Sequence, residues 1–101
     1  MGDVVFINCF DVPSGREEAF MALWKQIDDY MRAKPGFQWR RLHRALSDDT
    51  RLRYINVAGW ASAQEFEAAH DDKFREMEAQ SGWAEFPAFP ALYTVEDQSG
   101  I

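Results

Sequence analysis

Residues 37–60, FQWRRLHRALSDDTRLRYINVAGW, contain the pattern that decides the fold. Two segments rich in aromatic and β-branched residues, 37–46 and 51–60, flank the polar sequence SDDT at residues 47–50. Such segments favour strands, and a group of Ser, Asp and Thr favours a turn. Because two strands joined by so short a turn pair in antiparallel fashion, we expect a β-hairpin at the centre of the chain.

Upstream of the hairpin, the sequence predicts a strand and then a helix. Residues 3–11 (DVVFINCFD) have the composition of a strand, and Ser14 with Glu17 matches the spacing of a helix capping box. The helix is expected to run from there to the break at Pro35-Gly36. Its apolar stripe follows helical spacing and consists of Phe20, Leu23, Trp24, Ile27, Tyr30 and Met31.

Downstream of the hairpin, a second helix is expected in two pieces. Ser62 and Glu65 match another capping box, and the helix that they open extends to about His70. The acidic pair that follows interrupts the helix before a further helical piece. Residues 83–90 contain two prolines and are expected to be irregular, whereas residues 91–96 (ALYTVE) predict a final strand.

The predicted order of elements is βαββαβ, with the second helix divided. This order is typical of the ferredoxin-like α+β fold. We therefore expect a four-stranded antiparallel sheet with the helices on one face. The length of 101 residues fits a single domain over residues 1–101.

The composition excludes several classes of partner. The net charge is −6, and no cluster of Lys and Arg is long enough to bind nucleic acid or an anionic membrane. The single cysteine, Cys9, permits no internal disulfide. The chain shows neither a charged leader followed by an apolar block nor an apolar run of about 20 residues, so a soluble, cytoplasmic protein is expected.

The expected hairpin also predicts which side chains share a face of the sheet. If residues 47–50 form the turn, opposed residues share one face with the residues two positions away. The opposed pairs are then Phe37–Trp60, Trp39–Ala58, Arg41–Asn56 and His43–Tyr54. The other face is expected to carry the apolar residues Leu42, Leu46, Ile55 and Val57.

Aromatic walls with a few polar groups are typical of a small-molecule pocket, so we predict a ligand site on the first of these faces. The helical segment that follows residue 60 is expected to close it. His43 is the candidate acid or base of the pocket, because the pKa of histidine lies near neutral pH. The candidate lining residues are Phe6, Asn8, Trp24, Trp39, Arg41, Tyr54, Asn56, Trp60 and Phe66.

Several of these residues also have a purely structural interpretation. Asn is unfavourable in the middle of a strand, so Asn8 and Asn56 are either ligand-binding groups or satisfied structural amides. Trp60 belongs either to the core or to the ligand site, and Arg41 is either an ion-pair partner or a ligand contact. His70, near a helix end, is expected to interact favourably with the helix dipole.

The sequence predicts neither a metal nor an organic cofactor. It has only two histidines and one cysteine, and none of the spacings HxH, HExxH or CxxC occurs. No glycine-rich loop suited to a phosphate or a dinucleotide is present, because the glycines at 15, 36, 59 and 82 are isolated.

The order and spacing of several segments carry a family resemblance over residues 4–95. The segments are FINCFDVPSG, KPGF, RLHRAL, YINVAGWASAQEF and PALYTVED, together with Trp24 and Lys73-Phe74. Through them the chain resembles the antibiotic biosynthesis monooxygenases, a family of small dimeric α+β barrels. The resemblance implies the ferredoxin-like fold and a homodimer.

The quinone-forming members of that family use an Asn and a Trp with the spacing N-x-x-x-W. Asn56 and Trp60 match this spacing. Those enzymes also use a Tyr six residues after the Trp, where this chain has Phe66. The detailed proton-transfer scheme of those enzymes therefore does not carry over directly to this chain.

Haem-degrading members of the family share a different set of residues. Their Asn on the first strand is matched by Asn8. Their Trp in the second helix falls on Ala69, and their haem-ligating His falls near Met77 or Glu78. Haem degradation is therefore disfavoured.

The activity that the resemblance implies is the cofactor-free oxidation of a phenol or an anthrone to a quinone by O₂. In this scheme Asn56 donates a hydrogen bond to the substrate oxygen, Trp60 binds or polarises it, His43 takes the proton and Arg41 stabilises the anion. Two alternatives stay open at this point. One is a non-catalytic dimer that binds a small molecule or haem in the same pocket, and the other is a structural dimer whose aromatic face is an interface.

Overall fold

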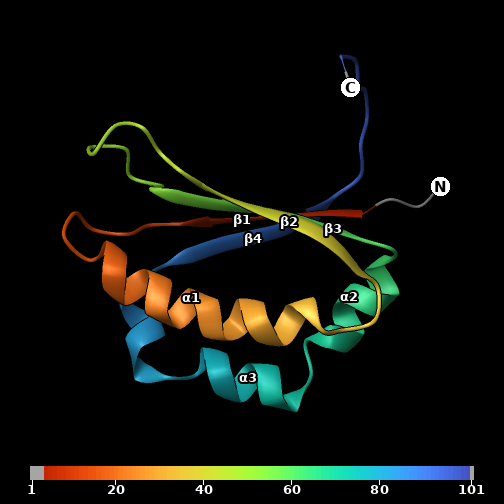
Figure 1. The fold of residues 1–101 in the computed structure, drawn as a ribbon, viewed down its shortest axis with the longest axis horizontal. Coiled ribbons are helices and arrows are strands. Elements are labelled where there is room, and N and C mark those ends of the chain that lie inside the picture. The colour runs from red at the N-terminus through yellow and green to blue at the C-terminus, as the bar shows by residue number, and fades with distance from the viewer. Residues whose placement is uncertain (1–3, 101) are drawn as a thin grey trace.

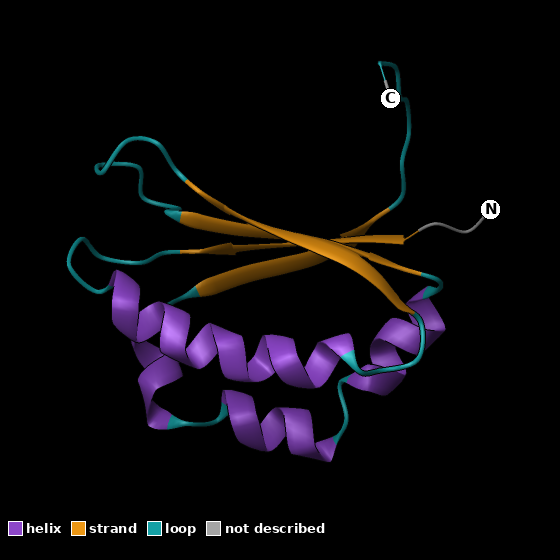
Figure 2. Cartoon of the chain, in the orientation of Figure 1, coloured by secondary structure: helices purple, strands orange, loops and turns teal. Residues whose placement is uncertain are grey.

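The computed structural model describes residues 4–100 and has an α+β fold (Figure 1 and Figure 2). The strands form one antiparallel sheet in the order β2-β3-β1-β4, and the helices all lie on one face of it (Figure 1). The predicted order of elements is confirmed. The elements are β1 (Val4–Phe10), α1 (Glu17–Arg32), β2 (Phe37–Arg44), β3 (Tyr54–Trp60), α2 (Ala63–Ala69), α3 (Asp72–Glu78), the 3₁₀ helix η1 (Ser81–Glu85) and β4 (Ala88–Tyr93).

One of the two predicted helix caps forms and the other does not. At the start of α2, Ser62 Oγ accepts a hydrogen bond from the Glu65 N–H (3.0 Å), as expected. The cap that was expected from Ser14 is wrong, because α1 begins at Glu17 after Arg16, whose side chain makes no capping bond. The Glu17 carboxylate instead accepts from the Gly15 N–H (2.9 Å), which closes the turn before the helix. Within residues 4–100, no helix has the length and apolar character that a membrane crossing requires.

The last strand begins earlier than predicted. β4 starts at Ala88 and includes Pro90, so the expectation of irregular structure up to residue 90 is wrong at this point. A proline lacks the N–H of a central strand, but β4 is at the edge of the sheet and pairs only with β1. An edge strand tolerates proline because one row of its backbone groups has no partner strand.

The register of the β2–β3 hairpin also differs from the expected one. The Ala45 N–H donates to the Arg53 carbonyl oxygen (2.8 Å), so the loop comprises residues 46–52 rather than 47–50. A loop with an odd number of residues changes the register by one, and a strand shifted by one residue presents the opposite set of side chains to each face. The observed pairs are Arg44–Tyr54, His43–Ile55, Leu42–Asn56, Arg41–Val57, Arg40–Ala58 and Trp39–Gly59.

A bulge at Gln38 ends the shifted register. Phe37 pairs with Trp60 as expected, whereas Trp39 pairs with Gly59. The Trp39 indole covers Gly59 so closely that a Cβ at this position would lie 2.1 Å from Trp39 Nε1. Glycine within a strand allows such a close approach, and the extra residue of a bulge restores the pairing beyond it.

The shifted register corrects several predicted positions. Trp39, Arg41 and His43 lie on the face of the sheet that has no helices, so their predicted inward position is wrong. Leu42 was expected on that outer face but packs against the helix-side core, and Leu46 lies fully exposed in the loop.

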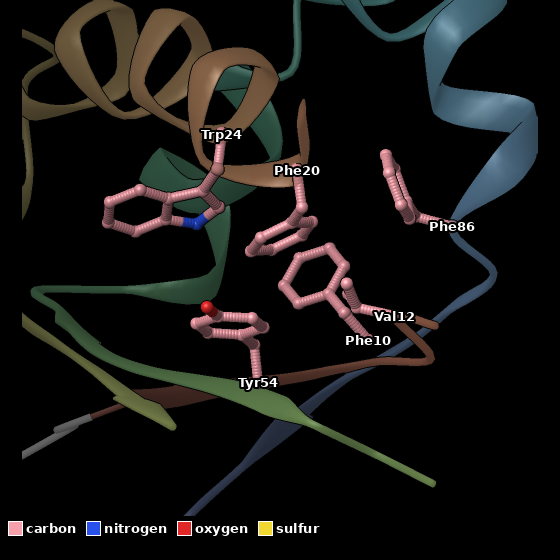
Figure 3. Packing of buried hydrophobic residues seen from close by; sticks show 6 residues of the cluster. All are labelled: Phe10, Val12, Phe20, Trp24, Tyr54 and Phe86. Atoms are coloured by element: carbon pink, nitrogen blue, oxygen red, sulfur yellow. The ribbon is translucent and has the colours of Figure 1, made fainter. Parts of the chain in front are cut away.

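The largest core cluster lies between α1 and the sheet. Figure 3 shows Phe20 and Trp24 projecting from α1 toward side chains of the sheet. Phe20 is fully buried and stacks on Tyr54, with ring centroids 4.7 Å apart. Offset aromatic contacts of this kind stabilise the packing beyond the apolar area that they bury. The buried members of the cluster are Phe10, Val12, Phe20, Trp24, Tyr54 and Phe86.

A polar contact attaches α3 to the end of α1. The Asp71 carboxylate caps α3 by accepting from the Phe74 N–H (3.0 Å), and it also accepts from Lys34 Nζ (2.7 Å) and the Tyr30 hydroxyl (2.6 Å). The hydrogen bond from Lys34, and next that from Tyr30, hold the pKa of the Asp71 carboxyl well below its usual range. The contact joins three segments through one carboxylate.

We expect Asp71→Asn to destabilise the fold at neutral pH. Asn caps a helix as well as Asp does, so the substitution removes mainly the charge. Because the folded-state pKa of Asp71 is depressed, its stabilising effect is present above the unfolded-state pKa of about 3.9 and is lost as the pH falls through the folded value. Urea denaturation should therefore show a difference from wild type at pH 7 that shrinks toward pH 3. Asp72→Asn, at an exposed neighbouring position, is the control and should show no such pH-dependent difference.

Candidate functional site

A cavity of about 590 Å³ lies between the sheet and the helices. Residues of β1 and β3 line one side of it and residues of α1 another, while α2, α3 and the segment after α3 close it. The prediction that the segment after Trp60 closes the pocket is thus confirmed. A cavity in this size range suits a small organic molecule.

The walls of the cavity are mostly aromatic. Trp60 is 2% exposed and makes edge contacts with Phe37 and Phe66, whose ring centroids lie 5.6 Å and 5.5 Å from its own. Aromatic walls favour a ligand that offers a flat apolar ring for stacked or edge contacts. The other aromatic lining residues are Phe6, Phe10, Trp24, Phe74, Trp83 and Phe86.

Two asparagines face the cavity from adjacent strands. Asn8 and Asn56 are directly opposed in the pairing of β1 with β3, and both line the cavity. The side-chain oxygen of each is buried and accepts no hydrogen bond from the residues that the structure describes. An unsatisfied buried polar group costs about 1–3 kcal/mol, so a hydrogen-bond donor that reached either oxygen would stabilise this wall.

A buried ion pair lies in another part of the wall. Arg40 Nε and Nη2 donate to the two oxygens of Asp28 (2.8 Å and 2.9 Å), and Arg32 Nε lies 3.1 Å from Asp28 Oδ2. The hydrogen bond to Asp28 raises the pKa of the Arg40 guanidinium, so this group stays charged. Arg32 also pairs with Asp29 (2.7 Å), so the two arginines and two aspartates beside the cavity balance in charge. The Arg40 guanidinium also lies over the Trp24 ring, 5.1 Å from its centroid.

His70 contributes an imidazole to the wall. Its Nδ1 lies 2.7 Å from the Phe66 carbonyl oxygen, and its ring packs between Phe66 and Phe74, with centroids 4.2 Å and 4.4 Å away. The contact with a carbonyl of the last turn of α2 agrees with the predicted interaction at the helix end. Among residues 4–100, no three His, Cys, Asp or Glu side chains are grouped closely enough to hold a metal ion.

The structure brings six of the predicted pocket residues together and separates the others. Tyr54 faces the helix side but packs into the core against Phe20 rather than lining the cavity. Trp39, Arg41 and His43 lie on the opposite face of the sheet, which excludes them from the cavity. The residues brought together are Phe6, Asn8, Trp24, Asn56, Trp60 and Phe66.

Six polar lining residues were not predicted at the site: Asp28, Arg40, His70, Glu78, Gln80 and Ser81. Arg40 was missed because the sequence gives no sign that the hairpin loop has an odd number of residues, which turns Arg40 inward. Asp28 interrupts the apolar stripe of α1 at a buried position, which is a signal that an inward-facing cation is near. His70 lies four residues after Phe66, and residues at this helical spacing share a face, so its position was available from the sequence.

Asp28→Asn is expected to lower the free energy of unfolding by about 1–3 kcal/mol, because Arg40 then loses its charged acceptor at a partly buried position. Asp29→Asn is the matched control. Asp29 pairs with the same Arg32 but is 66% exposed, so its loss should change stability by less than about 0.5 kcal/mol. Urea denaturation of both variants measures the difference, and equal effects would contradict this account of the ion pair.

Comparison with known proteins gives a consistent assignment. The family model of antibiotic biosynthesis monooxygenases matches residues 3–80. No match is found among curated proteins. A candidate monooxygenase from Shewanella loihica PV-4 is similar in structure, with a TM-score of 0.84 and 31% sequence identity over 96% of this chain and 97% of that one.

Two more distant structures share the fold. SnoaB, a cofactor-independent oxygenase from Streptomyces nogalater, has a TM-score of 0.81 at 22% identity over 97% of each chain. Rv0793 from Mycobacterium tuberculosis has a TM-score of 0.77 at 16% identity over 98% of this chain and 100% of that one. The family match covers most of the chain and agrees with the residues from which the resemblance was inferred. The chain therefore belongs to the antibiotic biosynthesis monooxygenase family.

Proposed function

We propose that this protein is a cofactor-independent monooxygenase that oxidises a small phenol or anthrone to a quinone with O₂. The observation that carries the proposal is the aromatic cavity, in which the opposed Asn8 and Asn56 have unsatisfied amide oxygens. The aromatic walls suit the ring of such a substrate, and the amides suit its oxygen atoms. Family membership and the likeness to the cofactor-independent oxygenase SnoaB support the same class of reaction.

The net reaction requires nothing except the substrate and dioxygen. An anthrone methylene loses two hydrogens and gains one oxygen atom, and the second oxygen atom leaves as water, so that all electrons come from the substrate. The protein therefore has to hold the ring, favour the substrate anion and exclude bulk water. Each of these requirements falls on side chains of the cavity wall.

We assign the roles in the site as follows. The Asn56 amide donates a hydrogen bond to the substrate oxygen as negative charge develops, and the indole N–H of Trp60 polarises the same oxygen. Asn8, opposite Asn56, holds a second polar group of the ligand. Arg40 replaces the excluded Arg41 as the cation beside the anion, because it lines the cavity and stays protonated in its pair with Asp28.

Asn56→Ala and Trp60→Phe are expected to reduce turnover of a model anthrone. The loss of one donor to a developing oxyanion lowers kcat by on the order of 10²-fold. The measurement is oxygen uptake with purified protein, together with the absorbance of the quinone formed. Both variants should keep the circular dichroism spectrum of the wild type.

Trp39→Phe is the control for Trp60→Phe, because it makes the same change on the opposite face of the sheet. Wild-type oxygen uptake no faster than the uncatalysed reaction would refute the monooxygenase proposal. A phenol or quinone that raised the melting temperature without turnover would then favour the binding protein considered above.

The protein is further proposed to act as a homodimer that buries the helix-free face of the sheet (Figure 1). Apolar residues lie on this face in three neighbouring strands, including Ile55 and Val57 in β3 and the half-exposed Phe89 and Tyr93 in β4. A sheet with helices on one side only leaves an apolar face that a second copy covers well.

Val57→Glu should convert the dimer to a monomer, because it places a charge at the middle of the proposed interface. Size-exclusion chromatography with light scattering at micromolar concentration measures the mass of each form. Leu46→Glu is the control, since Leu46 is an exposed apolar residue in the β2–β3 loop, outside the paired strands. A wild-type protein of monomer mass would refute the dimer.

A further inference from the structure

The tautomer of His70 follows from its hydrogen bond. A carbonyl oxygen only accepts, so the contact of 2.7 Å with the Phe66 carbonyl requires the hydrogen to lie on His70 Nδ1. In the neutral ring, Nε2 then carries a free lone pair and is a proton acceptor. The packing of the ring between Phe66 and Phe74 fixes its plane.

His70 also lies where two cavities meet. A second cavity of about 380 Å³ extends from the first toward β4 and the outer part of α3. The two cavities share Phe6, Asn8, Phe66, His70, Phe74, Glu78 and Ala88 as lining residues. His70 therefore lines both cavities. Asn8, one of the two asparagines with an unsatisfied amide oxygen, lines both cavities as well.

We propose that His70 Nε2 is the base that accepts the proton of the bound substrate, an inference that rests on the proposed function. The other charged groups in the walls of the two cavities are poor acceptors. The Asp28 carboxylate is already paired with Arg32 and Arg40, and the arginines remain protonated. Glu78 and Arg75 line the second cavity from α3 but are exposed to solvent.

The proton-transfer step balances without any further reagent. The O–H or C–H bond of the substrate breaks, its proton goes to Nε2, and the electron pair remains on the substrate. The anion gives one electron to O₂, and the two radicals combine to a peroxide on the ring carbon. The imidazolium returns its proton to the peroxide, water leaves, and the product is the quinone with neutral His70. The Phe66 carbonyl stabilises the intermediate imidazolium through the hydrogen bond from Nδ1.

The two histidines of the chain allow a matched experiment. His43 Nδ1 also contacts a backbone carbonyl, that of Ile55 at 3.2 Å, but His43 lies on the helix-free face. The side-chain amide of Asn can donate the hydrogen bond that Nδ1 donates to the carbonyl oxygen, but it cannot act as a base. We therefore compare His70→Asn with His43→Asn. His70→Asn should lower kcat by on the order of 10²–10⁴-fold, and His43→Asn should leave it unchanged.

Two readouts separate a base from a structural residue. The wild-type rate should fall as the pH drops and the imidazole becomes protonated, and this fall should disappear in His70→Asn. Free imidazole should restore part of the activity of His70→Ala. An active wild type with undiminished turnover in His70→Asn would overturn the inference and leave the proposed function intact. Reduced turnover with an unchanged pH profile and no rescue would also overturn it.

A second measurement does not depend on turnover. Long-range ¹H–¹⁵N NMR spectra identify the tautomer of each imidazole, with His70→Asn and His43→Asn providing the assignments. On addition of 4-nitrophenol at neutral pH, the nitrogen signals of His70 should move to those of an imidazolium while the phenolate absorbance rises and His43 stays unchanged. If the wild type oxidises nothing, this shift still supports proton transfer to His70, and its absence overturns the inference.

Discussion

The pairing of β2 with β3 changes by one residue at Gln38, and the composition of the cavity wall depends on that change. Side chains alternate along a strand, so the register set by the loop places Arg40 rather than Arg41 on the inner face, and the bulge lets Phe37 face inward as well. The bulge is accommodated by contact of the Trp39 indole with Gly59, where a larger residue has no room. Beyond the bulge, Phe37 pairs with Trp60, and Trp60 is buried.

The second constraint is the placement of polar groups in an otherwise apolar interior. The fold satisfies Asp28 fully with two arginines but leaves the oxygens of Asn8 and Asn56 without partners among residues 4–100. Unsatisfied polar groups destabilise a fold, and they recur where a protein keeps hydrogen-bonding capacity for a ligand. In this chain they occur side by side on neighbouring strands, in the wall of the cavity that His70 also lines.

Local sequence signals predicted the elements of the fold well, because they act within a few residues. The Ser62 cap and the spacing of Phe20 and Trp24 are signals of this kind. Register is different, since it depends on whether the loop after Ala45 has an even or an odd number of residues, and the polar sequence of that loop fits both. Asn8, Asn56 and Trp60 were placed correctly because β3 pairs with β1 independently of the hairpin.

The site itself was therefore predicted only in part. The residues of β1, β3 and α2 were found, but the acid or base of the pocket was predicted at His43, on the strand whose register was wrong. His70 was interpreted as a helix-end residue, and it makes that contact through Nδ1. A histidine that donates a hydrogen bond through Nδ1 still has Nε2 as a second nitrogen that can accept a proton.

The attachment of α3 has a consequence for how molecules reach the interior. None of the residues of α3 is buried, and one carboxylate, that of Asp71, ties its start to the end of α1. Segments with little buried surface open locally at a much lower free energy than the whole fold. Amide hydrogens of α3 should thus exchange with solvent long before those of β1 and β3. Opening of α3 and unfolding of the sheet are then separate events, and the first exposes the cavity residues that α3 covers without loss of the fold.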